Sequence, residues 1–458
     1  MSRYRELRDP VHGFIRIEDR ECDVVDSPAF QRLRRIRQLA MAYLVYPGAT
    51  HSRFEHSLGV VHVAGLMCHK LGIDQAHTRL IRLAALVHDI GHGPFSHVSE
   101  EVYDALGTNV DGGDVHKIHE FIGQQVIRND DVLRKCISER DAEEVLQLLK
   151  GGLDQPLYRS VISGPLDADK QDYLLRDSYY CGVRYGLYDL PRLHGVLGVD
   201  SNDAGQFLVV DEDGVPTLEQ FVLARYYLTT QVIAHKGRRI SDAMLIRALT
   251  LGVATDGLGF LKKLYTFEPT GEFYNEFMRW NDERLVTHLL EPEHAATWAG
   301  KIARRLAERR LFKLVVRRDV ASVDGLAVAP GGIDDLRGDL EASVAEELSK
   351  FSPEPVDRAE VVVQIVKAQP ARKSEGPLLV RNGRGGFDTL DDRSVIFGPI
   401  NQKLQARYLE CYAPIAEIDE QGRQKLYAKI DELLLERVAK LLSSTPSDTA
   451  ETSSGETS

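Results

Sequence analysis

Histidines are concentrated in one part of this chain, where they could act as metal ligands or as acid–base groups. Ten of the fifteen lie between residues 51 and 119, far more than an even distribution would place there. These ten are His51, His56, His62, His69, His77, His88, His92, His97, His116 and His119. Imidazole suits proton transfer near neutral pH and is a common ligand of metals. We therefore expect a chemical site in this region.

The densest part of this region is the run LVHDIGHGPFSH, residues 86–97. His88 and Asp89 end an apolar stretch that we expect to be a buried helix, and a buried carboxylate is costly unless it is paired or bound to metal. Imidazole together with carboxylate suits Mn, Fe, Zn or Mg rather than a soft metal. A capped helix with an ion-paired aspartate is the alternative. Three histidines in this short run favour the metal site.

Two glycines separate the histidines of this run. Gly91 and Gly93 would let the backbone turn sharply after the helix. We therefore expect His92 and His97 to point back at the cavity that contains His88.

Two further segments, THSRFEHSLGV and LDADKQDYLLRD, offer ligands that would complete a metal site. Their candidate ligands are His51 and His56 upstream and Asp167, Asp169, Asp172 and Asp177 downstream. At helical spacing, Asp169, Tyr173 and Asp177 share one helix face. Such a face could bind metal on its first turn and a sugar further along. A solvated acidic helix face is the alternative.

The elements that must position these residues are mostly helices. Apolar periodicity and capping residues predict helices over residues 28–39, 54–71, 77–90, 138–150, 157–180, 218–251, 298–309 and 419–443. Residues 197–215 predict two short strands around a turn, hence a hairpin. Strands are also expected in RLFKLVVRR, VVVQIV and SVIFGPI. We therefore expect a mostly α fold with a small β-hairpin, followed by a smaller α+β region.

Length and composition limit the class of protein. A chain of 458 residues is too long for one compact core, and 43% hydrophobic with 28% charged residues is ordinary for a folded, soluble protein. We find no membrane-spanning run, no secretion signal and no CxxC pair among five cysteines, so we expect a cytoplasmic protein without a membrane partner. The net charge of −12 argues against a surface that binds nucleic acid throughout. The basic segment over residues 31–39 is either a local phosphate site or a solvated helix face.

Several motifs resemble those of a known family. DPVHG, DSPAFQRLRRIRQL, YPGATHSRFEHSLG and HDIGHGPFSH occur in the order seen in HD-domain dNTP triphosphohydrolases, followed by DADKQDYLLRD. The branch that this chain resembles most contains the animal sterile-alpha-motif/HD-domain dNTPase and its bacterial dGTPase-like homologues. The resemblance is dense from residue 5 to about residue 190 and loose to about residue 250.

The resemblance and the predicted elements together divide the chain. We expect a mostly helical HD domain over residues 1–265, with a regulatory segment over residues 1–40. A smaller α+β region would follow over residues 266–445, where we recognise no family. Residues 446–458 contain almost no apolar side chain, so we expect a disordered tail.

The resemblance implies a divalent metal ion, which would be Mn, Mg, Fe or Zn. The metal ligands that it implies are His56, His88, Asp89 and Asp169. It also implies that His92, His97 and His119 line the phosphates of a nucleotide. Among these, His97 would be the general acid on the leaving 5′ oxygen, oriented by Glu100 where relatives often have Asp.

The substrate implied by the resemblance is a dNTP, cleaved to a deoxynucleoside and inorganic triphosphate. Arg53 would contact the α-phosphate or the base, and Lys170 would contact phosphate. The residues implied around the deoxyribose are Gln38, Leu39, Tyr173 and Asp177. Of these, Tyr173 would oppose a 2′-hydroxyl.

The same branch implies an activating nucleotide, GTP or a dNTP, bound between subunits of a homo-oligomer (dimer or tetramer). The positions that match its regulatory site are Arg5, Asp26, Gln31 and Arg34. The later basic pattern of the family does not align with HKGRRISDAM. The unassigned candidates there are His235, Lys236, Arg238 and Arg239.

Two other functions stay open. The first is an HD phosphohydrolase for another nucleotide, such as a monophosphate, a cyclic dinucleotide or an alarmone; Tyr173 and Gln38 favour a deoxynucleotide instead. The second is a protein that senses nucleotides or binds single-stranded nucleic acid. The intact set of histidines and aspartates argues against a protein that has lost hydrolysis.

Overall fold

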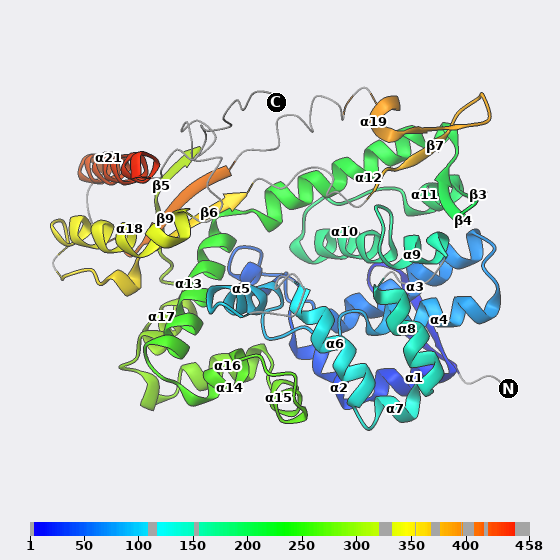
Figure 1. Cartoon of the computed structure of the whole chain (residues 1–458), viewed down its shortest axis with the longest axis horizontal. Helices are drawn as coiled ribbons and strands as arrows, with labels where there is room; N and C mark the ends of the chain where they lie inside the picture. The colour runs from blue at the N-terminus through cyan, green and yellow to red at the C-terminus, as the bar shows by residue number, and fades with distance from the viewer. Residues whose placement is uncertain are drawn as a thin grey trace, which may run out of the picture. The chain divides into compact units, whose positions relative to one another are not determined.

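The computed structural model consists mostly of helices, with three small sheets among the residues that it describes (Figure 1). The described residues are 4–108, 117–150, 155–319, 332–352, 354–367, 376–394, 396, 407–415 and 420–444. The expected mostly α fold with small β elements is confirmed. Contacts divide the chain into two compact units, residues 1–310 with 369–404 and residues 311–368 with 405–458. The first unit thus extends past the predicted boundary at residue 265.

The first unit opens with a β-hairpin that the sequence analysis did not predict. Strands β1 (Tyr4–Asp9) and β2 (Gly13–Glu18) pair antiparallel along their whole length. The Asp9 carboxylate accepts a hydrogen bond of 2.8 Å from the backbone N–H of His12, and Gly13 has a φ of +79°. The aspartate and the left-handed glycine together make the tight turn.

The helix predicted over residues 28–39 is wrong in its length. Helix α2 (Pro28–Arg32) and the 3-10 turn η1 (Leu33–Arg35) occupy only the first part of that range. Beyond them, the backbone N–H of Arg37 donates to the Asp282 carboxylate at 2.9 Å. A tertiary hydrogen bond thus replaces the helical one, which local propensity does not reveal.

Three helices of the first unit pack against one another around the predicted site. Helix α3 (Arg53–Lys70) contacts both α4 (Gln75–Val87) and α10 (Ala168–Cys181). The carboxylates of Asp74 and Asp167 cap α4 and α10 by accepting hydrogen bonds from backbone N–H groups of the first turn. These caps set where α4 and α10 begin.

The single helix predicted over residues 157–180 is wrong, because the structure has two. Helix α9 (Pro156–Ile162) ends before Pro165, which has no N–H to donate within a helix. Helix α10 then begins after Asp167. The break places Asp169 in the first turn of α10, close to the start of a new helix.

The remaining helices of the first unit surround this core. They are α1 (Asp19–Asp26), α5 (His97–Ala105), α6 (Ile118–Asn129), α7 (Leu133–Cys136), α8 (Glu139–Lys150), α11 (Leu190–Val196), α12 (Val215–Leu228), α13 (Lys236–Ala254), α14 (Gly259–Tyr265), α15 (Gly271–Phe277), α16 (Asp282–Leu289), α17 (Trp298–Ala307) and α19 (Leu390–Arg393). The helices predicted over 138–150 and 298–309 are confirmed as α8 and α17. The one predicted over 218–251 is interrupted by a π-helical turn, Thr229–Ile233.

The predicted hairpin is confirmed and belongs to a larger sheet. Strands β3 (Leu197–Asn202) and β4 (Gly205–Val210) pair antiparallel. Strands β7 (Leu379–Arg381) and β8 (Phe387–Thr389) extend the sheet in the order β3-β4-β7-β8, with β4 and β7 parallel. A late segment of the chain therefore returns to complete the first unit.

The second unit is a small α+β structure. Its three strands, β5 (Lys313–Asp319), β9 (Arg407–Ala413) and β6 (Val362–Lys367), form an antiparallel sheet in that order. Helices α18 (Gly332–Ser349) and α21 (Glu420–Ser444) pack on this sheet and on each other. The predicted strands RLFKLVVRR and VVVQIV and the predicted helix over 419–443 are confirmed.

Some expectations concern residues outside the described part of the chain. These are most of the predicted strand SVIFGPI (residues 394–400), the tail over residues 446–458, and His116. Within the described part, no single helix has the length and apolarity to cross a membrane. Only α13 and α14 together, bent by 108°, reach that length and composition.

Gly91 lies in the turn after α4 and is closely packed. A Cβ at this position would lie 2.1 Å from the backbone oxygen of His119 and 2.3 Å from the backbone nitrogen of Gly123. The residues of this run with a left-handed backbone are instead Phe95 and Ser96, with φ of +59° and +55°. The backbone does turn at Gly91, but neither Gly91 nor Gly93 has a positive φ, so the left-handed part of this run does not depend on the glycines.

We predict that Gly91→Ala destabilises the protein by about 3 kcal/mol, because the new methyl group meets backbone atoms that cannot move aside. The urea midpoint of unfolding, followed by circular dichroism, measures this loss. Gly195→Ala in helix α11 is the control, since its Cβ would have nothing within 4 Å. That control should leave stability unchanged or raise it by up to ~1 kcal/mol. Equal midpoints for the two variants would contradict the prediction.

Candidate metal centre and catalytic histidines

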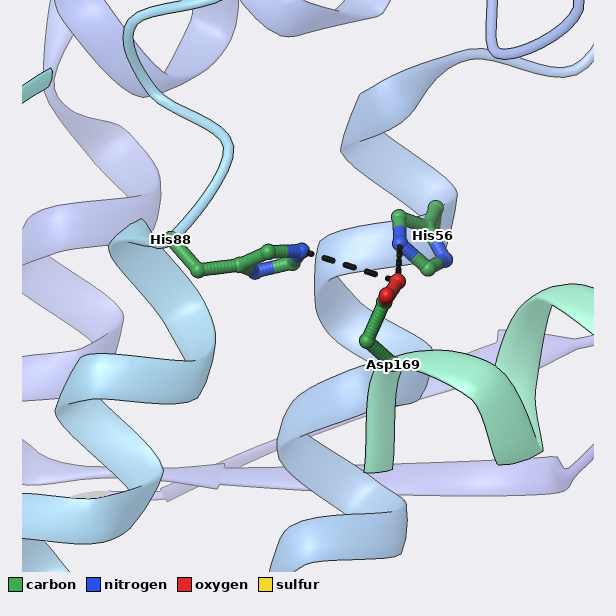
Figure 2. A group of neighbouring side chains, drawn as sticks. All are labelled: His56, His88 and Asp169. Atoms are coloured by element: carbon green, nitrogen blue, oxygen red, sulfur yellow. Dashed lines mark ion pairs between the residues drawn. The ribbon is translucent and has the colours of Figure 1, made fainter. Parts of the chain in front are cut away.

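Three side chains from three helices meet at one point of the first unit (Figure 2). His56 lies in the first turn of α3, His88 ends α4, and Asp169 lies in the first turn of α10. Nε2 of His56 is 2.9 Å from Oδ1 of Asp169, and Nε2 of His88 is 3.9 Å from the same oxygen. One nitrogen or oxygen from each residue thus lies within 4.8 Å of the others.

Asp89 brings the fourth predicted ligand to the same place. Its Oδ1 lies 3.2 Å from Nε2 of His88, and its Oδ2 lies 3.8 Å from Nε2 of His56. Oδ2 also accepts a hydrogen bond of 2.5 Å from Nη1 of Arg53. The structure therefore brings all four predicted ligands together, while their binding of a metal stays a prediction.

The two imidazoles turn their Nε2 atoms toward this centre. Nδ1 of His88 lies 2.8 Å from the backbone oxygen of Ala85, and Nδ1 of His56 lies 2.8 Å from Oδ2 of Asp172. Each Nδ1 can donate its proton there, which leaves Nε2 of His88 with a free lone pair and gives Nε2 of His56 one once its second proton is lost. Nε2 of His88 is buried without a hydrogen-bond partner, a costly state that a cation would relieve, and Nε2 of His56 faces the carboxylate of Asp169. Two imidazoles and two carboxylates fit a divalent ion such as Mn, Fe or Zn.

Electrostatic interactions keep a positive charge at this centre. Burial lowers the pKa of His56, but hydrogen bonds to Asp169 and Asp172 outweigh it and raise this pKa to about 10. Burial raises the pKa of Asp89, but Arg53 and the neighbouring imidazoles outweigh it and hold that pKa well below its usual range. Ionised carboxylates therefore surround a proton on His56, at the place where a metal ion would compete with it.

Behind the centre, Asp172 accepts hydrogen bonds from three side chains. Nε2 of His12 lies 2.6 Å from its Oδ1, in addition to the contact with His56. Arg176 donates to both carboxylate oxygens of Asp172 at 2.8 and 2.9 Å, and to Asp9 at 2.8 Å. The sequence analysis missed His12 and Arg176. The motif DPVHG, which contains His12, was the one local signal for the first of them.

Glu100 gathers the three histidines predicted to line the phosphates. Its carboxylate oxygens lie 2.8 Å from Nδ1 of His97, 2.5 Å from Nδ1 of His119 and 3.5 Å from Nδ1 of His92. Burial raises the pKa of Glu100, but hydrogen bonds from His119 and His97 hold it well below its usual range. An ionised Glu100 favours a proton on each Nδ1. The Nε2 atoms, on the opposite side of each ring, then point away from Glu100.

His92, Glu100 and His119 also place donor atoms within 4.8 Å of one another, as a second metal site would. The rings of His92 and His119 are stacked, however, with centroids 4.0 Å apart and planes inclined by 11°. Nearly parallel rings cannot direct their lone pairs at one ion, so electrostatic contact with the Glu100 carboxylate explains this group better. The side chain of His97 is 62% exposed, so a ligand can reach it.

The predicted substrate residues on α10 have partners within the protein. Nζ of Lys170 forms an ion pair of 2.7 Å with Asp167, which a phosphate contact would have to replace. Asp177 accepts from Nε2 of His51 at 2.8 Å. Burial raises the pKa of Tyr173, so its hydroxyl stays protonated and can donate a hydrogen bond.

The other predicted substrate residues come from α3 and from the segment before it. Nε of Arg53 donates to Oγ of Ser96 at 2.7 Å, so its guanidinium is held between Ser96 and Asp89. Oε1 of Gln38 is buried without a hydrogen-bond partner, and the side chain of Leu39 is buried. The sequence analysis did not single out Ser96. Contact of these residues with a substrate stays a prediction.

The four residues predicted to bind a regulatory nucleotide form two pairs. Arg5 donates two hydrogen bonds to the carboxylate of Asp26 at 2.7 and 2.6 Å, and both side chains are exposed. Nε of Arg34 donates to Oε1 of Gln31 at 2.9 Å, and its guanidinium lies over the ring of Phe54. Their role in binding a nucleotide stays a prediction.

Two family models match this chain. Residues 53–164 match the model described as HD domain, and residues 199–425 match the one described as HD associated region. The first match contains three of the four predicted metal ligands, His56, His88 and Asp89. The fourth, Asp169, lies beyond it. The second covers strands and helices of both compact units.

Relatives include proteins of known and unknown function. The chain is 33% identical to the uncharacterized protein YwfO of Bacillus subtilis, over 69% of this chain and 72% of that protein. It is 35% identical to an uncharacterized protein of Methanocaldococcus jannaschii, over 53% of this chain and 49% of that protein. It is 27% identical to the human deoxynucleoside triphosphate triphosphohydrolase SAMHD1, over 68% of this chain and 54% of that protein. The chain thus spans about half the length of the archaeal and human relatives.

Two solved structures have a similar fold. A hypothetical protein from Aquifex aeolicus is 28% identical with a TM-score of 0.67, over 94% of this chain and all of that one. A phosphohydrolase from Bacteroides thetaiotaomicron is 25% identical with a TM-score of 0.69, over 90% of this chain and all of that one. With the HD-domain match and the similarity to YwfO over most of its length, these findings show that the chain belongs to the HD-domain phosphohydrolase family.

Proposed function

We propose that this protein hydrolyses deoxynucleoside triphosphates to deoxynucleosides and inorganic triphosphate, with the help of a divalent metal ion. One observation carries the proposal: a centre of two imidazoles and two carboxylates lies beside three histidines that share Glu100. Nε2 of His92 lies 3.2 Å from Oδ1 of Asp89, which connects the two groups. Deoxynucleoside triphosphate triphosphohydrolases among the relatives support the choice of substrate.

A divalent ion held by His56, His88, Asp89 and Asp169 would polarise the phosphoryl oxygens and acidify a water molecule. Beside this centre, Arg53 presents a guanidinium fixed by Asp89 and Ser96, which suits an α-phosphate.

We propose His97 as the general acid of this reaction. Glu100 accepts a hydrogen bond from its Nδ1, so a protonated His97 would present its second N–H, on Nε2, at an exposed position. Water attacks the α-phosphorus, the bond to the 5′ oxygen breaks, and this proton passes to the leaving oxygen. His92 and His119 would line the phosphates beside His97.

We also propose that the face of α10 beyond the centre binds the sugar. Tyr173 follows Asp169 by one helical turn and Asp177 by two, so a nucleotide with its phosphates at the centre would place its sugar along this face. Gln38 and Leu39 would complete the pocket. The bulk of Tyr173 would oppose a 2′-hydroxyl and favour deoxyribose.

An activating nucleotide, GTP or a dNTP, is proposed for Arg5, Asp26, Gln31 and Arg34. The exposure of the Arg5–Asp26 pair supports this proposal, because a base or phosphate can exchange for one partner without opening the core. A homo-oligomer would supply the second side of such a site.

We predict that each dNTP, incubated with the protein and Mn²⁺ or Mg²⁺, yields deoxynucleoside and triphosphate, as read by chromatography. Asp169→Ala should lower the rate at least ~100-fold, because it removes a charged metal ligand. Asp203→Ala, in the exposed β3–β4 turn, is the control and should keep full activity. Turnover only in a mixture of nucleotides would support an activator site. No turnover of any dNTP, or turnover of monophosphates or cyclic dinucleotides instead, would contradict the proposed reaction.

We predict that metal affinity rises with pH. The pKa of His56 in the metal-free protein is raised from 6.5 to about 10, so the proton is held in the folded state across the neutral range and lost only as pH rises through 10. A metal ion must displace this proton, and the apparent Kd for Mn²⁺ should fall about tenfold per pH unit between pH 6 and 8. Titration calorimetry measures the Kd. A Kd independent of pH would refute the exchange of proton for metal.

We predict that Glu100→Gln lowers kcat by about 100-fold, because the amide cannot hold the three imidazoles as a carboxylate does. Bound metal, measured by mass spectrometry, should stay the same, since Glu100 is not a predicted ligand. Glu100→Asp should keep at least a tenth of the activity. Asp104→Asn, on the exposed face of α5, is the matched control. Loss of metal from Glu100→Gln would instead assign Glu100 to the metal centre.

A further inference from the structure

The turn that leads into α5 is strained. Phe95 and Ser96 both have positive φ, and the ψ of Ser96 is −116°. Residues with a Cβ rarely adopt such a backbone, and it persists only where the surrounding structure imposes it. The next residue is His97, and Glu100 follows one turn later. The orientation of both therefore depends on this turn.

The same turn also positions Arg53. Oγ of Ser96 accepts a hydrogen bond of 2.7 Å from Nε of Arg53 and donates one of 2.8 Å to the backbone oxygen of Arg37. Arg53 in turn donates to Asp89 at the metal centre. If Ser96 relaxed to an ordinary backbone, its hydroxyl would leave both partners.

Asp282 holds this turn from a distant part of the sequence. Its Oδ1 accepts a hydrogen bond of 2.7 Å from the backbone N–H of Phe95, 187 residues earlier. Its Oδ2 accepts one of 2.9 Å from the backbone N–H of Arg37. Asp282 is 3% exposed and is the first residue of helix α16. One side chain thus connects the strained turn to the segment that carries Gln38 and Leu39.

Arg32 makes a second connection, between the segment before α16 and the run that contains the strained turn. Nη1 of Arg32 donates to the backbone oxygen of His92 at 2.8 Å, and its Nε donates to the backbone oxygen of Trp280 at 2.8 Å. Burial lowers the pKa of Arg32 to about 10, so it remains charged at neutral pH. The segment from Trp280 to Asp282 is therefore connected to residues 92–96 twice, directly through Asp282 and indirectly through Arg32.

We infer that Asp282 is a positioning residue for the proposed hydrolysis: it closes the strained turn and so orients His97 and Arg53 without touching the substrate. This inference rests on the proposed function. The predicted metal ligands lie on α3, at the end of α4 and on α10, outside the strained turn. We therefore expect the metal centre to keep its geometry when the turn relaxes.

The chain contains a matched control for this role. Asp256 also accepts two backbone hydrogen bonds, from the N–H groups of Trp298 and Ala299 at 3.1 and 2.9 Å. It caps the start of α17, on elements that carry no predicted site residue. Asp256→Ala therefore removes the same number of carboxylate–backbone bonds outside the site.

The first measurement is hydrogen exchange in Asp282→Ala and Asp256→Ala, with Asp282→Asn as the variant that keeps one acceptor oxygen if the alanine form does not fold. Peptides covering residues 33–40 and 91–98 should exchange at least ~10-fold faster when Asp282 is replaced. The Asp256 variant should leave both peptides unchanged. This readout is independent of activity, so it decides whether Asp282 holds the turn even if dNTPs prove not to be substrates. Unchanged exchange in both peptides would overturn the inference.

The second measurement separates positioning from general destabilisation. On a dNTP, replacing Asp282 should lower kcat by about 100-fold with bound metal nearly unchanged, chiefly because the general acid is misplaced. On the analogue with sulfur at the bridging 5′ position, a thiolate leaves without needing that proton. The loss should then shrink to about threefold. Equal losses on the two substrates would overturn the inference, and no turnover by the unsubstituted protein would refute the proposed function instead.

Discussion

A buried carboxylate with three partners is the interaction on which this site depends. Asp172 accepts hydrogen bonds from His12, His56 and Arg176, and so joins the N-terminal hairpin, α3 and α10. Gly59 makes this possible, because a Cβ there would lie 1.8 Å from Oδ1 of Asp172. An ionised carboxylate with any of these donors missing would be costly to bury. The hairpin and the two helices must therefore assemble together, and His56 acquires its orientation as a consequence.

Three histidines of the site share one feature: their Nδ1 atoms face acceptors within the protein. Nδ1 of His88 faces the backbone oxygen of Ala85, Nδ1 of His56 faces Asp172, and Nδ1 of His97 faces Glu100. With each Nδ1 committed to an acceptor, the Nε2 atoms are left for ligands. The ring orientations, and the nitrogen that each ring turns toward a ligand, are thus set by the protein before any ligand arrives, which reduces the reorganisation that binding or catalysis would require.

The parts that the sequence predicted well are those encoded over short distances. His88 and Asp89 are adjacent, and Asp169, Tyr173 and Asp177 follow helical spacing, so local periodicity suffices to place them. Where local patterns compete with tertiary contacts, the predictions failed. The helix expected beyond Arg35 gives way to a hydrogen bond from Arg37, and the helix over residues 157–180 is broken near Pro165.

The turn before α5, which positions His97, is the part of the site that is hardest to predict from the sequence, for a physical reason. Glycine is the residue that local rules assign to a left-handed backbone, yet in this loop Phe95 and Ser96 adopt it. Such strain costs of order 1–3 kcal/mol per residue, and local sequence cannot offset it. The compensating hydrogen bonds come from Asp282, which becomes a neighbour only once the first unit has folded. A turn stabilised in this way forms only in the complete fold, so the alignment of His97 depends on the same cooperative assembly as the core.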